Sequence, residues 1–549
     1  MYTPSSFCTI CTKTCKQELV GFLLSLSVHH PNASCHVMCD TETKKFLDIL
    51  TPQPKLNLKW YVTLDKYSKH NRQEMCKLKI WDEFQMMKAE VIRKALEVEK
   101  DTLFLDSDIV IFDKIDGIDH SKQIGVSPQF IQKKNVDQVG YYNGGVLWTN
   151  QKSLPDNWIK YTKTSRYHDQ ASVEDLAKIY PKFEFGENYN LQTWRFMLGL
   201  EPRNKIMNSI VAKPNLGKVF YKDKPLKFYH THFNSPQFKI FNDYIISKLQ
   251  EASCYRELLC ISRLINNKWT IQMPKQPRND MFRHVNDSFR EIPNMLKQTH
   301  SDIQVVVSDK SGHIWLEPQI AKVMLYDRPT LNWMNDEVKK TNLLLIGNGS
   351  MELEGAKLKA FGARNVKPWI FWPRSPTTME KVLREKGLLG YNQRTNESVF
   401  IGNFENPVQQ KFRITPHKWE TVITEYHCTK GHAQKFTQEQ YLMKLRNSKF
   451  GISLRGFGSK CHREVELMAF GTVLIVTPEV STKSYMEPLI ENKHYLLVRN
   501  PAELKEKVKN LSQEKWEEMS KACIEWYDRN VRVKNLWTNT MSHILWPNN

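Results

Sequence analysis

The chain has 549 residues, of which 40% are hydrophobic and 25% charged, and it carries a formal net charge of +20. This composition excludes a disordered chain, and the length favours two to four domains over one. The positive charge favours polyanionic partners (nucleic acid, an anionic membrane face or phosphorylated small molecules) without choosing among them. Much of the charge is lysine interspersed with glutamate, as in residues 503–518, which is typical of a solvated helix face.

The 11 cysteines are too sparse in so long a chain for a secreted disulfide framework, so we expect reduced thiols. Cys8 and Cys11 have the spacing of half a zinc site, but a matching second pair is missing. Phe7, Thr9 and Ile10 between and beside them are strand formers. We therefore favour a first β-strand here and keep zinc as the alternative.

The sequence does not open with a basic segment followed by an apolar one, as a secretory signal would. The apolar run Leu19–Val28 is too short to span a bilayer, and we expect a buried helix there. These observations predict a soluble cytoplasmic protein without a membrane span. A composition rich in Lys and Asn is compatible with a virus-encoded protein that acts in the host cytoplasm, or with a microbial one.

Short apolar segments alternate with amphipathic segments through the first half of the chain. We predict, in chain order, strand 9–12, helix 17–29, strand 35–40, helix 43–50, strand 59–64, helix 81–97 and strand 102–112. Such alternation is typical of a parallel, doubly wound α/β sheet, which binds its ligands at the carboxyl ends of the strands.

A proline-containing polar segment at 273–280 interrupts the alternation. We expect a linker at 265–297 between a domain at 1–264 and a second α/β domain at 298–549. In the second domain we predict strands at 303–308, 342–347, 368–372, 398–402, 419–424, 449–454 and 471–476.

Two carboxylates, Asp106 and Asp108, interrupt the apolar segment 102–112. On a strand, residues two apart point to the same face, and two converging carboxylates repel one another unless a cation neutralises them. A hard divalent cation, Mn²⁺ or Mg²⁺, is the natural partner of such oxygen ligands and keeps positions open for phosphate oxygens. The alternative is that one aspartate caps the following turn.

The neighbouring motifs strengthen the prediction of a metal site at Asp106 and Asp108. A helix upstream carries Lys88, and the segments downstream are "YYNGGVLWTN", "HDQASVEDL" and "FYHTHF". In this order, the motifs resemble those of nucleotide-sugar glycosyltransferases of the GT-A fold, especially the family 8-like enzymes and related nucleotide-diphospho-sugar transferases. The resemblance implies a Rossmann-like GT-A domain and a metal-dependent transferase (EC 2.4). Its partners would be a UDP- or GDP-sugar donor and a glycan or glycoprotein acceptor.

The resemblance also implies roles for individual residues. The metal ligands would be Asp106, Asp108 and a histidine, either His230 or His232. The residues implied in donor binding are Thr9 for the base or ribose, Asp106 for the ribose, Lys88 for the diphosphate or sugar, and Asn143, Gly144 and Gly145 for close approach of the sugar.

Asp169 and Gln170 have two possible roles. In an inverting enzyme Asp169 would deprotonate the acceptor hydroxyl, whereas in a retaining enzyme it would orient the sugar together with Gln170. The alternative for Lys88, the glycines and the histidines is purely structural: a solvated lysine, a plain turn and hydrogen-bonded histidines.

The stretch 448–476 is the informative part of the second half. A strand is followed by a glycine-containing loop, a helix with acidic residues and another apolar strand, which suits phosphate binding at a helix start. Arg455 and Arg463 would clamp a diphosphate, and Glu464 or Glu466 would accept hydrogen bonds from ribose. The stretch resembles the nucleotide-sugar-binding half of exostosin-like GT-B enzymes, although Pro478 is displaced from that family's pattern.

Together these expectations describe a GT-A domain followed by a GT-B-like Rossmann-type domain, a bifunctional glycosyltransferase. One alternative is a single active GT-A domain with a non-catalytic second domain that binds acceptor or partner. A nucleic-acid enzyme is the rival class, but two-metal phosphoryl transfer requires a further acidic cluster, which the sequence does not offer. A non-enzymatic carbohydrate-binding protein is the third reading.

Overall fold

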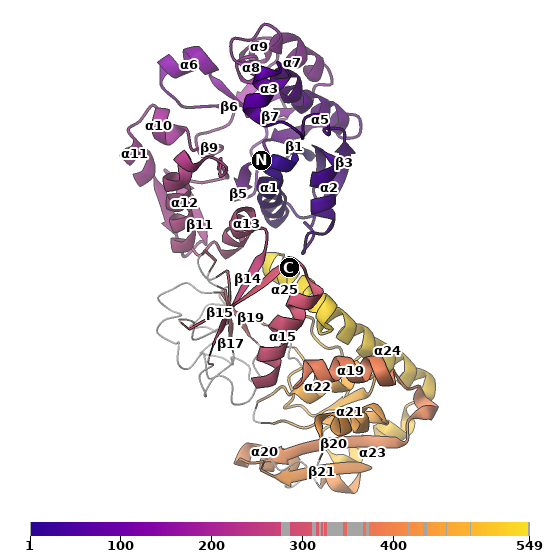
Figure 1. Ribbon diagram of the computed structural model, residues 1–549. Coiled ribbons are helices and arrows are strands. Elements are labelled where there is room, and N and C mark those ends of the chain that lie inside the picture. Colours follow the sequence, from indigo (N-terminus) through magenta and orange to yellow (C-terminus); the bar gives the residue numbers. More distant parts are fainter. Residues whose placement is uncertain are drawn as a thin grey trace. The chain divides into compact units, whose positions relative to one another are not determined.

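The computed structural model describes residues 2–275, 286–309, 314–317, 320–321, 323–326, 344–347, 366–368, 373–414, 418–431, 436–456, 458–483 and 485–546 (Figure 1). The chain forms two compact units. Unit 1 comprises Met1–Trp269 and Gln319–Ala321, and unit 2 comprises Thr270–Pro318 and Lys322–Asn549.

A seven-stranded sheet forms the centre of unit 1, in the order β3-β2-β1-β4-β7-β6-β8. Strands β3, β2, β1 and β4 run parallel, β7 is antiparallel to β4 and β6, and β8 is parallel to β6. The strands are β1 Ser6–Cys11, β2 Ser34–Cys39, β3 Asn57–Val62, β4 Thr102–Leu105, β6 Ile124–Pro128, β7 Tyr142–Thr149 and β8 Lys182–Glu184.

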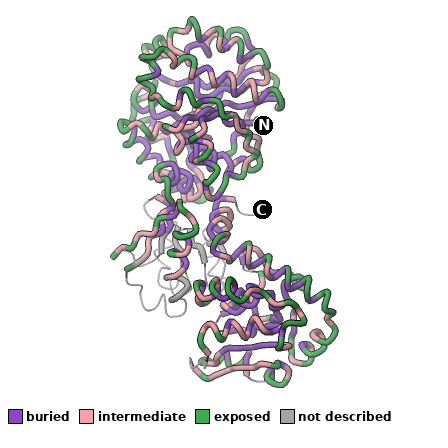
Figure 2. Tube along the Cα trace, turned by 45° about the vertical axis from the view of Figure 1, so that its right-hand side comes forward, coloured by how far each residue is buried: buried purple, intermediate pink, exposed green. Residues whose placement is uncertain are grey.

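Helices bury this sheet, so that β1, β4, β6 and β7 have no exposed residue (Figure 2). Side chains of α5, α7 and α9 share one hydrophobic cluster with β4, β6 and β7. The helices of unit 1 are α1 Lys16–His29, α2 Thr41–Asp48, α3 Arg72–Lys77, α4 Trp81–Gln85, α5 Met87–Leu96, α6 Lys133–Val139, α7 Leu154–Thr162, α8 His168–Ala171, α9 Val173–Ile179, α10 Arg195–Leu198, α11 Arg203–Asn208, α12 Lys239–Glu251 and α13 Tyr255–Ile265.

Two smaller sheets complete unit 1. One has the order β5-β13-β9, with β5 Ile109–Ile111, β13 Phe228–His230 and β9 Leu191–Gln192. The other is antiparallel, with β10 Ile210–Lys213, β11 Lys218–Tyr221 and β12 Lys224–Pro225.

The predicted strand 102–112 is therefore wrong as a single element. Its first part is β4 of the central sheet and its last part is β5 of a different sheet, with residues 106–108 in the turn between them. The predicted helix 81–97 is likewise two helices, α4 and α5. The predicted first strand and the buried helix over Leu19–Val28 are confirmed.

The described residues of unit 2 form two sheets. The first has the order β15-β14-β16-β17-β18-β19, with β14 Trp269–Pro274, β15 Ile303–Ser308, β16 Ile314–Leu316, β17 Val323–Tyr326, β18 Leu344–Gly347 and β19 Val366–Pro368. The second is wholly parallel, in the order β21-β20-β22-β23-β24, with β20 Asn396–Phe404, β21 Glu425–Lys430, β22 Ser448–Ser453, β23 Val473–Val476 and β24 Tyr495–Leu497.

Helices of unit 2 pack on the parallel sheet, where β20, β22 and β23 share a buried cluster with α23 and α24. The described helices of unit 2 are α15 Asn286–Thr299, α19 Pro376–Lys386, α20 Pro407–Arg413, α21 Gln438–Arg446, α22 His462–Ala469, α23 Pro501–Asn510, α24 Gln513–Asn530 and α25 Val533–Leu545.

Three further predictions concern this half. The predicted strand 419–424 is wrong, because Trp419–Thr421 forms a turn of 3₁₀ helix. Residues 369–372 of the predicted strand 368–372 lie outside the described residues. The range 265–297, which we expected to be a linker, contains β14 and most of α15.

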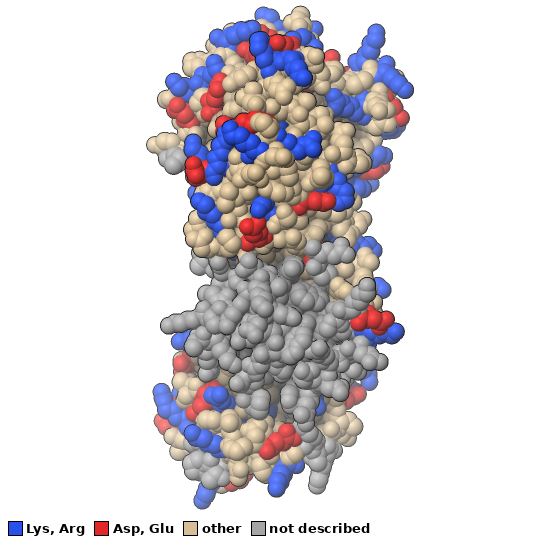
Figure 3. Space-filling model, turned by 90° about the vertical axis from the view of Figure 1, so that its left-hand side faces the viewer, with Lys and Arg blue, Asp and Glu red and all other residues tan. Residues whose placement is uncertain are grey.

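All 11 cysteines are free, as expected of reduced thiols. Among the described residues, no helix is long and apolar enough to cross a membrane. Basic side chains on the face of unit 1 in Figure 3 are interspersed with acidic ones. Many surface lysines pair with acids on the same helix, as Lys515 does with Glu518 at 2.8 Å, so part of the net charge is locally balanced.

Candidate functional site

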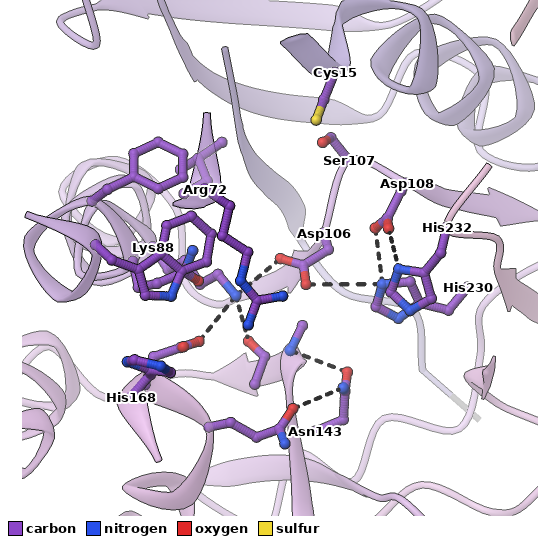
Figure 4. Close-up of a pocket in the computed structure, with 18 of the residues that line it drawn as sticks. Cys15, Arg72, Lys88, Asp106, Ser107, Asp108, Asn143, His168, His230 and His232 are labelled. Atoms are coloured by element: carbon purple, nitrogen blue, oxygen red, sulfur yellow. Dashed lines mark hydrogen bonds and ion pairs between the residues drawn. The ribbon is translucent and has the colours of Figure 1, made fainter. Parts of the chain in front are cut away.

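A cavity of about 490 Å³ lies in unit 1 where β1 and β4 end (Figure 4). All five motif segments singled out in the first half of the sequence reach this cavity. Its lining includes Lys88, Asp106, Asp108, Asn143, Gly144, Gly145, Asp169, Gln170, His230 and His232. Carboxyl ends of parallel strands are where α/β sheets bind ligands. The structure thus brings together segments that are far apart in the chain.

Pairing of β13 with β5 brings the histidine segment to the aspartates. His230 stands opposite Ile109 in this antiparallel pair, and Thr231 donates hydrogen bonds from its N and Oγ1 to the carbonyl of Asp108 at 2.9 and 2.8 Å. The chain then turns at His232, whose φ of 46° lies in the left-handed region that such a residue adopts rarely. Backbone strain of this kind clusters at functional sites.

Both histidines contact the same carboxylate. His230 Nε2 lies 2.8 Å from Asp108 Oδ1, and His232 Nδ1 lies 2.8 Å from Asp108 Oδ2. The two imidazoles stack on one another with ring centroids 4.4 Å apart. Burial alone would raise the pKa of Asp108, but the two imidazoles outweigh it and hold this pKa well below its usual range.

The donor set fits a divalent metal ion. One donor atom from each of Asp108, His230 and His232 lies within 4.8 Å of the others, and this is the one such group among the described residues. Nε2 of His232 is buried and has no hydrogen-bond partner. Asp106 stands at the edge of this group, with Oδ2 3.9 Å from His230 Nε2.

Lys88 joins the other side of the cavity. Its Nζ lies 3.1 Å from Asp106 Oδ1 and 3.0 Å from Asp169 Oδ2, and it donates a hydrogen bond to the carbonyl of Gly144 at 3.3 Å. Burial alone would lower the pKa of Lys88, but the two carboxylates outweigh it and raise this pKa. Lys88 is therefore neither the solvated lysine of the alternative reading nor a cation free of partners.

Gly144 and Gly145 are required by these carboxylates. A Cβ on Gly145 would lie 2.2 Å from Asp106 Oδ2, and one on Gly144 would lie 2.7 Å from Asp169 Oδ2. Asp106 and Gly145 are neighbours because β7 continues the antiparallel pairing past the end of β4, where Asp106 N donates to Gly145 O at 2.9 Å. Glycine at these two positions thus makes room for the carboxylates of Asp106 and Asp169. This role differs from the expected one, which was to let the sugar approach closely.

Asn143 connects the glycine segment to its neighbours. Its Nδ2 donates to Gln170 Oε1 at 3.4 Å and to Gln192 Oε1 at 3.3 Å, and its Oδ1 accepts from Gly145 N at 3.1 Å. Thr9, in contrast, is buried in the middle of β1 and is not among the residues that line the cavity.

The lining also includes residues that were not anticipated from the sequence, among them Arg72, Trp194 and Glu18. Glu18 is buried and accepts hydrogen bonds from Asn234 N and Nδ2 at 3.3 and 2.8 Å. Burial, and then the negative charge of Asp108, raise the pKa of Glu18 to about 8. The signal for Glu18 was present, since a glutamate directly precedes the apolar run Leu19–Val28.

The four residues predicted in the second half lie in unit 2 around the start of α22. Arg463 is buried, and Arg455 follows the end of β22. The two glutamates have partners within the fold: Glu464 accepts from Ser453 Oγ and Cys461 N, and Glu466 accepts from Arg374 N at 2.8 Å and Tyr441 OH at 2.7 Å. The expected ribose-binding role of these glutamates stays a prediction.

No model of a known protein family matches the chain, and no curated protein matches it. Among solved structures, it is similar to the galactosyltransferase LgtC in complex with donor and acceptor sugar analogs, at 15% identity and a TM-score of 0.29 over 44% of this chain and 95% of that one. It is also similar to the bifunctional glycosyltransferase WbbM, at 11% identity and a TM-score of 0.31 over 48% of this chain and 52% of that one. It is similar as well to the glycosyltransferase GlyE of Streptococcus pneumoniae TIGR4, at 9% identity and a TM-score of 0.29 over 92% of this chain and 98% of that one. TM-scores this low do not establish a common fold, so a function must follow from the chain's own site.

Proposed function

We propose that unit 1 is a metal-dependent glycosyltransferase that moves a sugar from a nucleotide-diphosphate donor to a hydroxyl of a glycan or glycoprotein acceptor. One observation carries the proposal. The five motif segments that resemble those of GT-A transferases all line one cavity, with Asp108, His230 and His232 arranged as a ligand set.

A divalent ion held by Asp108, His230 and His232 would neutralise the charge that grows on the diphosphate as the glycosidic bond breaks. Two imidazoles beside one carboxylate suit Mn²⁺ better than Mg²⁺, which prefers oxygen ligands throughout. Asp106 is held by Lys88 next to this set, where it can accept hydrogen bonds from donor hydroxyl groups.

Asp169 has its Oδ2 bound to Lys88 and facing Gly144. We assign it an orienting role for the sugar, together with Gln170, because an oxygen already bound to an ammonium is poorly placed to take a proton from an acceptor. Lys88 would act by fixing both acids, and so it positions the donor indirectly.

The rival class, a two-metal nucleic-acid enzyme, has less support. It requires carboxylates around a second ion, and among the described residues one potential metal cluster is present. A second transferase site in unit 2 also has less support than the first, since Glu464 and Glu466 are used by the fold. The GT-A and GT-B-like identities of the two units remain part of the proposal, supported by the parallel strands in each.

The test is turnover of a panel of UDP- and GDP-sugars, scored as released nucleoside diphosphate. After treatment with EDTA we expect activity to return with Mn²⁺, and Mg²⁺, Zn²⁺ and Fe²⁺ serve as comparisons. Asp108→Asn should lower turnover by about a hundredfold or more, in line with the loss of a metal ligand. Asp48→Asn, at an exposed aspartate on α2, is the matched control.

Binding of Mn²⁺, followed by electron paramagnetic resonance, gives a second readout that does not need the right donor. The proposal fails if no donor turns over, or if Asp108→Asn binds Mn²⁺ and reacts as the unaltered protein does.

A further inference from the structure

A network of buried side-chain amides lies beside the candidate metal ligands of unit 1, with Asn190 at its centre. Asn190 directly precedes β9, and it is 1% exposed. Its φ of 44° lies in the left-handed region, which asparagine adopts more readily than most non-glycine residues. Asn190 belongs to none of the predicted motif segments, and it is not among the residues that line the cavity. A strained backbone at a buried polar residue next to a site is a reason to look for a function.

The amide of Asn190 forms three hydrogen bonds. Its Nδ2 donates to Asn143 Oδ1 and to Ser127 Oγ, both at 3.1 Å. Its Oδ1 lies 3.3 Å from Nδ1 of His230, the ring nitrogen that does not face Asp108. Asn190 therefore connects a candidate metal ligand to the asparagine that precedes the two glycines of the cavity.

Two backbone groups fix the orientation of these amides. The amide N–H of Gly145 can only donate, and it donates to Asn143 at 3.1 Å, so the atom of Asn143 that it meets is the oxygen. The carbonyl of Val139 can only accept, and it accepts from Gln170 Nε2 at 2.9 Å. Gln170 therefore presents its oxygen to Nδ2 of Asn143, at 3.4 Å. Both constraints require the same orientation of the Asn143 amide.

This orientation is passed on through Asn190 to His230. Because Oδ1 of Asn143 accepts a hydrogen bond, Asn190 presents Nδ2 to it, and so presents Oδ1 to the imidazole. An amide oxygen carries no proton, so the bond to His230 requires a proton on Nδ1 of the ring. In a neutral imidazole with its proton on Nδ1, the lone pair is on Nε2. That nitrogen lies 2.8 Å from Asp108 Oδ1, on the side of the ligand set.

A histidine that binds a metal ion through one ring nitrogen needs a partner for the other. The hydrogen bond to the second nitrogen selects the tautomer and holds the plane of the ring. Among the described residues, Asn190 is the one hydrogen-bond partner of His230 Nδ1. His232 has the opposite arrangement, because its Nδ1 faces Asp108 and its buried Nε2 has no hydrogen-bond partner. Asn190 thus acts on one of the two histidines only.

We propose that Asn190 is a positioning residue of unit 1, which fixes His230 with Nε2 available to a divalent ion and ties this ligand to Asn143 on the donor side. The inference rests on the proposed function, because it requires that Asp108, His230 and His232 bind the ion. It adds a residue that touches neither the ion nor the donor. It also explains why an asparagine stands at a backbone conformation that most side chains avoid.

The test is the affinity of the full chain for Mn²⁺, measured by electron paramagnetic resonance near neutral pH without any donor. Asn190→Gly removes the amide but suits a positive φ, so the variant should fold and should bind Mn²⁺ about tenfold or more weakly. Asn190→Asp also suits a positive φ and keeps an acceptor oxygen for His230 Nδ1. It should therefore bind Mn²⁺ within about threefold of the unaltered protein.

Asn188→Gly is the matched control. Asn188 is also buried, at 6% exposed, but its Nδ2 donates to Pro225 O at 2.9 Å and not to the network. This variant should lose stability, seen as a lower melting temperature, and keep its affinity for Mn²⁺. A purely structural role of Asn190 would make Asn190→Gly behave in the same way.

The outcomes separate this inference from the proposed function. If the unaltered protein binds Mn²⁺ and Asn190→Gly binds it as tightly, the positioning role is overturned and the metal site stands. The role is also overturned if Asn188→Gly weakens Mn²⁺ binding as much as Asn190→Gly does, or if Asn190→Asp does not restore the affinity. If the unaltered protein binds no Mn²⁺, the metal site of the proposed function fails, and the role of Asn190 fails with it.

Discussion

The buried cation of the unit 1 cavity permits a quantitative test, by replacement of Lys88 with methionine. Lys88 and Asp169 are each 6% exposed, and their charged atoms lie 3.0 Å apart. At an effective dielectric constant of about 20, one such contact corresponds to about 5 kcal/mol of attraction before desolvation. The second contact, with Asp106, counts for less because that side chain is 25% exposed.

Removal of one member of a buried pair typically costs about 3–5 kcal/mol, because the remaining charges lose their partner. We therefore expect Lys88→Met to lower the free energy of unfolding of unit 1 by about that amount. Lys94→Met on the same helix is the matched control. Lys94 is 41% exposed and pairs with Glu97 at 2.8 Å, and such surface pairs contribute little to stability.

Urea unfolding of the full chain, resolved by hydrogen exchange of peptides from unit 1, measures both variants. Adding Asp169→Asn to Lys88→Met should restore part of the loss, because it removes one of the two unpaired carboxylates. The reasoning is refuted if Lys88→Met destabilises unit 1 no more than Lys94→Met does, or if the second substitution adds its full cost to the first.

Two further predictions concern the same unit. His30 is buried and accepts a hydrogen bond from Ile115 N at 2.8 Å, and burial lowers its pKa from 6.5 to about 3. Below pH 6.5 the imidazole of His30 binds a proton in the unfolded chain but not in the folded one. The contribution of His30 to the free energy of unfolding is therefore fully present above pH 6.5 and declines as the pH falls toward 3. Between pH 7 and 5 the loss from this residue is about 2 kcal/mol. Hydrogen exchange at the two pH values should show this loss, and His30→Gln should lack it; an unchanged pH dependence in the variant would contradict the assignment. Gly145→Ala should destabilise unit 1 by about 1–3 kcal/mol, because the new methyl group overlaps Asp106 Oδ2. Gly390→Ala is the control: the atom nearest to its new methyl group is 3.6 Å away, so this substitution should not destabilise its own unit, unit 2. Equal destabilisation by the two substitutions would refute the steric argument.

Local sequence patterns predicted much of unit 1 because its strands and helices are short, strongly patterned and sequential. The apolar run after Glu18 is a buried helix, and the cysteine-containing segment at 8–11 is a strand. Periodicity failed where one apolar run serves two sheets: 102–112 reads as one strand because both of its ends are buried. It failed again at 419–424, where the buried Trp419 begins a turn of 3₁₀ helix.

The sequence by itself determined which residue types carry the chemistry of unit 1 and in what order they come. The tertiary structure decided how they meet. Asp108 receives both histidines because β13 pairs with β5, and not because aspartates two apart share a strand face. Lys88 is bound by two acids that lie in other segments of the chain. Such meetings depend on strand pairing between distant segments, which no local periodicity encodes.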